Sequence, residues 1–156
     1  MEILDLVAPE AVIAGLKAGS KKQALQLLSE KAASLTGLSE RDIFSVVFER
    51  ERLGTTGVGQ GIAIPHGKFD ELDRIIGVFA QLAKPIDFES LDNQPVDLVF
   101  LLLAPDHAGA EHLKALARVS RLLRDKDTCD KLRGSQDRDA LYALITHNQA
   151  LSLIHI

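Results

Sequence analysis

The chain has 156 residues, 46% of them hydrophobic, which suits a single domain with one well-buried core. The formal net charge of −4 and the absence of a long lysine or arginine cluster exclude the electrostatic footprint of a nucleic-acid-binding protein and give no sign of binding to anionic membranes. The single cysteine, Cys129, cannot form an internal disulfide, and the first ten residues lack the basic start and long apolar stretch of a signal peptide, so we expect a cytoplasmic protein.

A first helix is predicted between residues 20 and 37. Ser20, followed three residues later by Gln23, matches the capping-box pattern of a helix N-terminus, and Gly37 is typical of a helix end. Apolar residues recur between these ends at roughly helical spacing: Ala24, Leu27, Leu28 and Leu35. The capping signals and the spacing agree on one helix.

A second helix is predicted from Ser39, which is a typical N-cap residue. Its buried stripe is expected to contain Ile43, Val46 and Val47. The next position of that stripe, seven residues after Ile43, is occupied by Arg50. An arginine therefore stands where the pattern predicts an apolar residue, which makes Arg50 a candidate functional residue.

The stretch that follows predicts a loop and then a short strand. Residues 53–61, "LGTTGVGQG", are rich in glycine and threonine, and the alternating isoleucines of residues 62–64 favour a strand that leads to His66. Pro65 fixes its own φ angle, and Gly67 is expected to relax the backbone. We therefore expect His66 at the end of this strand, held in a defined direction.

The second half of the chain predicts two more strands and two more helices. The strands are expected over 74–83 and 96–105, with a turn-rich connection between them. The apolar run 98–104, "LVFLLLA", is far too short to span a bilayer and favours a buried strand, so no membrane insertion is expected. Helices are expected over 110–125 and 137–147. This mixture predicts an α/β fold in layers.

Three residues on or beside these patterns could support chemistry: Arg50, His66 and His112. His112 lies at the start of the helix over 110–125, on the same face as its apolar stripe. Alone, His112 could be a hydrogen-bonded structural residue, and Arg50 could extend its charged head to solvent from a half-buried helix end. Together they suit phosphoryl transfer, because an imidazole nitrogen is a nucleophile towards phosphorus and a guanidinium stabilises the charge on the phosphoryl oxygens.

Other kinds of site receive less support from the sequence. Three histidines, His66, His107 and His112, could in principle bind zinc, but the last two are five residues apart and no H-E-x-x-H motif is present. The glycine-rich loop matches neither common nucleotide-binding pattern, and Cys129 lies in a polar stretch without special neighbours. We therefore expect neither a metal nor a cofactor.

The chain closely resembles the enzyme IIA component of the bacterial phosphotransferase system, in its mannitol/fructose class, and within that class the nitrogen-related regulatory branch. The resemblance runs from about residue 3 to 147 and rests on "ERERLGTTGVGQGIAIPHGK", "IDFESLDNQPVDLVFLLLAP" and "EHLKALARVSRLLRD". It implies a single α/β sandwich with a mixed sheet flanked by helices. It also implies that His66 is the phosphorylated nucleophile, with Nε2 as the acceptor atom. His112 then matches the second active-site histidine, and Arg50 the active-site arginine.

The resemblance implies a phosphotransferase in the broad sense: a phosphocarrier that takes a phosphoryl group from an HPr-like phosphohistidine carrier protein. Its phosphorylation state would signal in nitrogen, carbon or potassium regulation, with target proteins such as kinases or potassium-transport components. Two alternatives stay open. The chain could be a sugar-specific enzyme IIA that passes phosphate to a fructose- or mannitol-type permease IIB domain, or a binding module without catalytic activity.

The domain is expected to occupy residues 1–150. Residues 151–156 form a tail of uncertain origin, because "ALSLIHI" at the C-terminus continues no recognisable pattern. His155 is left out of the functional argument for that reason. We expect a regulatory protein and not a sugar carrier, because no permease or sugar-binding segment follows the domain in this sequence.

Overall fold

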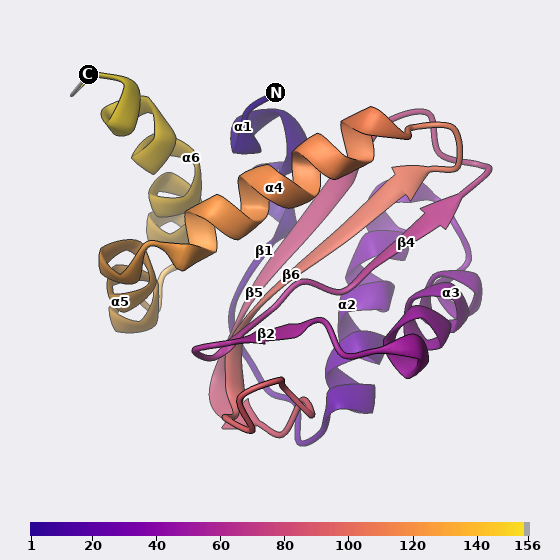
Figure 1. The fold of residues 1–156 in the computed structure, drawn as a ribbon, viewed down its shortest axis with the longest axis horizontal. Helices are drawn as coiled ribbons and strands as arrows, with labels where there is room; N and C mark the ends of the chain where they lie inside the picture. Colours follow the sequence, from indigo (N-terminus) through magenta and orange to yellow (C-terminus); the bar gives the residue numbers. More distant parts are fainter. Residues whose placement is uncertain (155–156) are drawn as a thin grey trace.

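The apolar run of residues 98–104 lies in the central strand of a mixed sheet (Figure 1). The computed structural model describes the backbone of residues 1–154 and the side chains of residues 1–147. Strand β6 (Val96–Pro105) is buried along nearly its whole length and pairs antiparallel with β5 (Ile76–Ile86). Strand β1 (Val12–Leu16) then pairs parallel with β5. A strand with neighbours on both sides and layers on both faces needs apolar residues at successive positions, which explains the unbroken run.

The candidate histidine enters the sheet on the other side of β6. Strands β3 (Ile62–Ala63) and β4 (His66–Phe69) follow one another along this side, both parallel to β6. Strand β2 (Gly57–Gly59) pairs antiparallel with β3 at the edge. In the register of this pairing His66 lies opposite Leu102. The backbone of His66 is therefore fixed by the central strand of the core.

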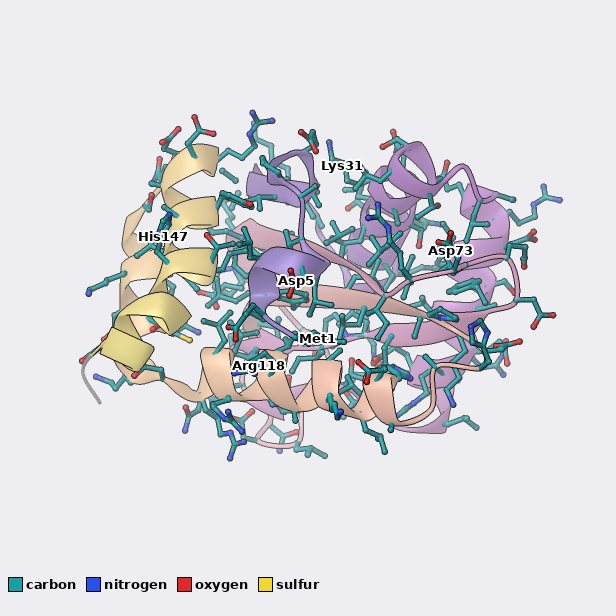
Figure 2. All side chains as sticks on the ribbon, turned by 90° about the horizontal axis from the view of Figure 1, so that it is seen from above. Met1, Asp5, Lys31, Asp73, Arg118 and His147 are labelled. Carbon is teal, nitrogen blue, oxygen red and sulfur yellow. The ribbon has the colours of Figure 1, made fainter. Side chains whose placement is uncertain are left out.

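Helices cover both faces of the sheet. Figures 1 and 2 show α2 and α3 on one face and α4 on the other, with α5 and α6 beside the far end of α4. The helical segments are α1 (Ile3–Leu6), the 3-10 turn η1 (Pro9–Ala11), α2 (Lys21–Thr36), α3 (Glu40–Leu53), α4 (Ala110–Arg124), α5 (Lys126–Gly134) and α6 (Arg138–Ile154). The predicted fold class, an α/β sandwich with a mixed sheet flanked by helices, is confirmed.

The helix ends that capping residues predicted are confirmed. The Ser20 hydroxyl accepts a hydrogen bond from the Gln23 backbone N–H, and the Ser39 hydroxyl accepts one from the Asp42 N–H. Gly37 ends α2 in the left-handed region, with φ of 79°, which only glycine adopts readily. The Gln23 side chain accepts from the Gly19 N–H and not from Ser20, so the capping box is only partly formed.

Several sequence predictions about the site region are wrong. His66 begins β4, whereas the alternation of isoleucines predicted that it ends a strand. Val46 is 36% exposed, although it was placed on the buried stripe of the second helix. The buried positions of α3 are Ile43, Val47 and Glu51, four residues apart, so the stripe leads to Glu51 and not to Arg50.

Helix α6 continues to Ile154, so the first part of the predicted tail, 151–154, is helical. Residues 155 and 156, and with them His155, lie outside the described residues. Within the described part of the chain, no helix is both long and apolar enough to cross a membrane.

Gly67 serves close packing and does not supply an unusual backbone conformation. Its φ angle is not positive, contrary to the expectation that it relaxes the chain. A Cβ atom at this position would lie 2.9 Å from Val46 Cγ1 and 3.3 Å from the Phe69 ring. Glycine therefore allows α3 to pack closely against β4, which brings the end of α3 towards His66.

Replacement of Gly67 by alanine is expected to destabilise the fold by about 1–3 kcal/mol, because the added methyl group overlaps Val46 in a packed contact. Urea unfolding measures the change. Gly134→Ala is the matched control, since a Cβ there meets nothing within 4 Å. Equal stability of the two variants would show that α3 can move away from β4 at little cost.

Candidate functional site

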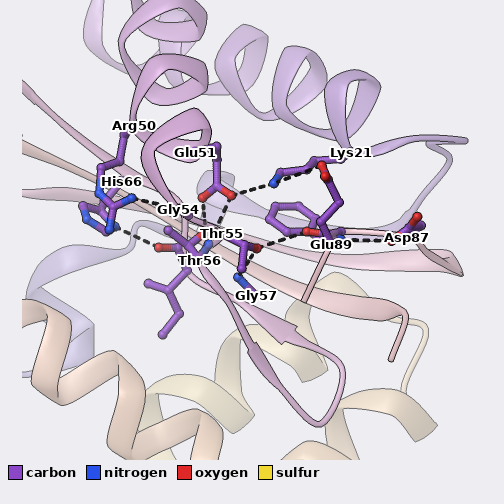
Figure 3. Close-up of polar contacts among 12 residues, drawn as sticks. Lys21, Arg50, Glu51, Gly54, Thr55, Thr56, Gly57, His66, Asp87 and Glu89 are labelled. Atoms are coloured by element: carbon purple, nitrogen blue, oxygen red, sulfur yellow. Dashed lines mark hydrogen bonds and ion pairs between the residues drawn. The ribbon is translucent and has the colours of Figure 1, made fainter. Parts of the chain in front are cut away.

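The ring of His66 is held in one orientation by a hydrogen bond to the backbone. Its Nδ1 lies 3.0 Å from the carbonyl oxygen of Ile64, two residues earlier (Figure 3). A carbonyl oxygen can only accept, so Nδ1 carries the proton and donates it. In the neutral ring, Nε2 is therefore unprotonated and keeps its lone pair. This nitrogen could therefore act as a nucleophile.

His112, in helix α4, lies edge-on to the ring of His66. The first turn of α4 places it there, and the two ring centroids lie 5.6 Å apart at an interplanar angle of 72°. His112 is 5% exposed, and its Nε2 is buried without a hydrogen-bond partner among the residues described. A buried polar atom without a partner is costly, so it is a candidate for binding a ligand oxygen.

Arg50 reaches the same place from the last turn of α3. Its side chain is half-buried and lies beside the His66 ring in Figure 3. One guanidinium nitrogen, Nη1, donates a hydrogen bond of 2.9 Å to the Gly54 carbonyl oxygen at the end of the helix. Since a guanidinium has five N–H donors, this bond orients the group and leaves other donors for an anion. The structure thus brings Arg50, His66 and His112 together from three elements.

Both histidines are easier to deprotonate than a histidine in water. Burial lowers the pKa of His66 below its ordinary value of 6.5, and Arg50 and Lys68 lower it further, while the hydrogen bond to Ile64 and the charge of Glu51 act in the opposite direction. Burial also lowers the pKa of His112, with added repulsion from His66 and Lys68. Both rings are therefore neutral near pH 7, as a nucleophilic imidazole requires.

These lowered pKa values predict how stability depends on pH. Below about pH 6.5 the unfolded chain binds protons at His66 and His112, whereas the folded chain binds fewer. The stabilising contribution of the neutral rings is thus fully present above pH 6.5, and the free energy of unfolding falls as the pH drops towards the folded pKa values. Urea unfolding between about pH 7.5 and 5.5 measures this, and His66→Ala/His112→Ala should show a shallower dependence. An equally steep dependence in that variant would assign it to other groups.

Two charged residues next to the site were not identified from the sequence. Lys68, two residues after His66, lowers the pKa of both histidines. Glu51 is 5% exposed and accepts hydrogen bonds from Thr56. The spacing of Ile43, Val47 and Glu51 was a usable signal, because a four-residue step continues the buried face as well as a seven-residue step does.

The other candidates from the sequence lie elsewhere. Among residues 1–147, no three His, Cys, Asp or Glu side chains are grouped so that they could hold a metal ion. His107 is exposed in the turn before α4. Cys129 is buried in α5, where its Sγ donates to the Leu123 carbonyl oxygen and burial raises the pKa of the thiol. A raised thiol pKa does not suit a nucleophile.

Comparison with known proteins gives consistent results. Residues 5–148 match the family model described as "Phosphoenolpyruvate-dependent sugar phosphotransferase system, EIIA 2". A nitrogen regulatory protein of Bradyrhizobium diazoefficiens is 63% identical over 145 residues, which cover 93% of this chain and 95% of that protein. One from Escherichia coli is 47% identical over 131 residues, 83% of this chain and 80% of that protein. The crystal structure of nitrogen regulatory protein IIA-Ntr from Neisseria meningitidis superposes with a TM-score of 0.87 at 31% identity, covering 92% of this chain and 99% of the other.

Proposed function

Since the chain belongs to the EIIA 2 family of the phosphoenolpyruvate-dependent sugar phosphotransferase system, we propose that it accepts a phosphoryl group on Nε2 of His66 from an HPr-like phosphohistidine carrier protein. The observation that carries the proposal is the hydrogen bond from His66 Nδ1 to the Ile64 carbonyl. This bond places the proton on Nδ1 and leaves the Nε2 lone pair for attack on phosphorus.

The transfer exchanges one nitrogen–phosphorus bond for another. The bond between phosphorus and the donor ring breaks as the bond to His66 Nε2 forms, and the electron pair of the broken bond returns to the donor nitrogen. The proton on His66 Nδ1 stays in its hydrogen bond to Ile64. The phosphorylated ring then carries a positive charge, which the carbonyl dipole of Ile64 stabilises.

Arg50 and His112 would act on the phosphoryl oxygens. The transition state is loose and its negative charge lies on the three equatorial oxygens. The guanidinium of Arg50, fixed by Gly54, supplies positive charge beside His66. His112 would donate a hydrogen bond from its Nε2, which has no partner among the residues described. Both groups are in place before the donor arrives, so little reorganisation is needed during transfer.

We propose further that the phosphorylation state is the signal, in regulation of nitrogen, carbon or potassium metabolism. The relatives named nitrogen regulatory protein support this role. Phosphorylation adds about −1.5 to −2 charges at neutral pH, which can weaken one partner contact by repulsion and strengthen another by pairing with arginines. Proteins of kinase or potassium-transport systems are the target classes expected. The family description names a sugar phosphotransferase system, so passage of the group to a IIB domain is the second candidate function.

The direct test is incubation with phosphoenolpyruvate and the general phosphotransferase components, followed by intact mass measurement. We expect one phosphoryl group per chain, lost in acid and retained in alkali, as for a phosphohistidine. A chain whose mass does not change would act as a binding module instead. This result would reject the phosphocarrier function without affecting the fold.

A second experiment separates regulation from sugar transport. Phosphorylated and unphosphorylated protein are used to capture partners from extract, and sugar uptake is measured in a strain without the chain. Regulation predicts partner sets that differ between the two states, by a coupling of about 1–3 kcal/mol for a given target. Identical partner sets together with loss of uptake of one sugar would favour the transport function.

A further inference from the structure

Glu51 is a buried carboxylate that the proposed transfer step does not use. It is only 5% exposed, although it follows Arg50 directly in α3. Lys21 of α2 pairs with it at 2.9 Å, and the Lys21 ammonium also lies over the Phe88 ring, 4.7 Å from its centroid. Burying an ion pair costs desolvation energy that its attraction only partly repays. A buried pair of this kind is therefore a weak source of stability, and its position next to the site calls for another explanation.

A continuous series of contacts connects this pair to His66. Glu51 Oε1 accepts the backbone N–H of Thr56 at 3.1 Å, and Oε2 accepts the Thr56 hydroxyl. The Thr56 carbonyl accepts the N–H of Ile64 at 3.1 Å. The Ile64 carbonyl then accepts the proton of His66 Nδ1 at 3.0 Å. Figure 3 shows Lys21 at one end of this series and His66 at the other, with Glu51 and Thr56 between them.

We infer that Glu51 is a positioning residue for phosphoryl transfer, an inference that rests on the proposed function: through Thr56 and Ile64 it holds the carbonyl that fixes the proton on His66 Nδ1. The backbone groups of the series belong to short connecting segments: Thr56 lies in the loop before β2, and Ile64 lies between β3 and β4. A carboxylate that accepts two hydrogen bonds from one residue restrains that residue in both direction and distance. Lys21 keeps the carboxylate in place from the adjacent helix.

The negative charge of Glu51 also acts on the His66 ring, in addition to the hydrogen bonds through Thr56 and Ile64. The charged and titratable groups that act on the His66 ring are Arg50 and Glu51 from α3, Lys68 from β4 and His112 from α4. Among these, Glu51 carries the negative charge that raises the pKa of His66. Since the phosphorylated ring is cationic, the negative charge of Glu51 stabilises that ring, whereas the negative charge of the phosphoryl oxygens would be met by Arg50 and His112.

The test compares Glu51→Gln with Glu89→Gln. Glutamine at 51 keeps the shape and one oxygen acceptor but removes the charge that holds Lys21. Glu89 is the matched control, because its carboxylate lies 3.8 Å from the same Lys21 ammonium but its side chain is 77% exposed. Long-range nitrogen–proton NMR of the His66 ring in the unphosphorylated protein shows which nitrogen carries the proton, and a titration gives its pKa. Single-turnover transfer from the phosphorylated carrier protein gives the rate and the carrier concentration at half-maximal rate.

For Glu51→Gln we expect part of the ring proton to move from Nδ1 to Nε2 and the pKa of His66 to fall further. The transfer rate should fall about 10-fold, while the half-saturating carrier concentration is unchanged because Glu51 does not reach the surface. Glu89→Gln should match the wild type in every measurement. A Glu51→Gln protein with the wild-type proton position and rate would overturn the inference.

Thr56→Val keeps the inference testable if Glu51→Gln does not fold. Valine removes the hydroxyl donor at nearly constant shape while the backbone N–H still binds Glu51. A folded Thr56→Val protein with an unchanged ring proton and unchanged transfer rate would overturn the inference; a smaller change in the same direction supports it. The ring measurement needs no donor protein. A wild-type chain that accepts no phosphoryl group would therefore reject the proposed function, while the NMR result would still decide whether Glu51 positions His66.

Discussion

His66→Ala is expected to accept no phosphoryl group from the phosphorylated carrier protein, whereas the wild-type chain accepts one. Alanine removes the proposed nucleophile, and His112 cannot supply a ring nitrogen at the same place, since its Nε2 is buried. His66 is half-buried at the start of β4, so the fold should survive the substitution. Intact mass after incubation with phosphoenolpyruvate and the general components measures incorporation.

The control for this variant is His107→Ala, which removes an exposed histidine from the turn before α4. It should be phosphorylated to the same extent as the wild type. His112→Ala should still be labelled, more slowly, because it loses a hydrogen-bond donor and not the acceptor atom. Full incorporation into His66→Ala would move the acceptor to another residue and would remove the basis of the proposed mechanism.

Arg50→Ala is expected to slow phosphoryl transfer by about 10²-fold or more while leaving the protein folded. In the proposed mechanism the guanidinium stabilises charge that develops on the phosphoryl oxygens, and its hydrogen bond to Gly54 orients it. The substitution should also raise the pKa of His66, because it removes a neighbouring positive charge. Transfer is followed in single-turnover experiments, and an NMR titration gives the pKa.

Arg52→Ala is a close control for the arginine, because it lies two residues further along the same helix. Its side chain is 65% exposed and pairs with Glu49 at 3.1 Å, a surface contact that contributes little to stability. The variant should transfer phosphoryl groups at the wild-type rate. If Arg50→Ala and Arg52→Ala behaved alike, Arg50 would merely extend its charge to solvent, and the charge stabilisation would have to come from Lys68 or the donor.

The prediction of helices and strands from sequence succeeded where the signal was local. The capping residues Ser20 and Ser39 marked the starts of α2 and α3, because an N-cap needs only its own side chain and a backbone N–H three residues away. The unbroken apolar run of β6 marked the centre of the sheet. The three candidates Arg50, His66 and His112 were identified one by one, and the structure places them around a common point.

Other features could not be predicted, because they depend on residues far apart in the chain. Strand β4 has only four residues, and its pairing with β6 forms across more than thirty positions of sequence. A short strand of this kind has little pattern of its own, so His66 was expected to end the preceding strand. Helix α5 is mostly polar, and only its packing against α4 and α6 makes it a helix of the fold.

The sequence by itself thus determined the α/β fold and identified two histidines and an arginine at the ends of elements as candidates for chemistry. Only the tertiary structure decided how these groups act together. The Ile64 carbonyl holds the proton on His66 Nδ1, and the buried Glu51 carboxylate binds Thr56. Arg50 of α3 and His112 of α4 both lie next to the His66 ring. The physical reason is that hydrogen-bond partners and burial set a tautomer and a pKa, and both depend on contacts between segments that the chain order keeps apart.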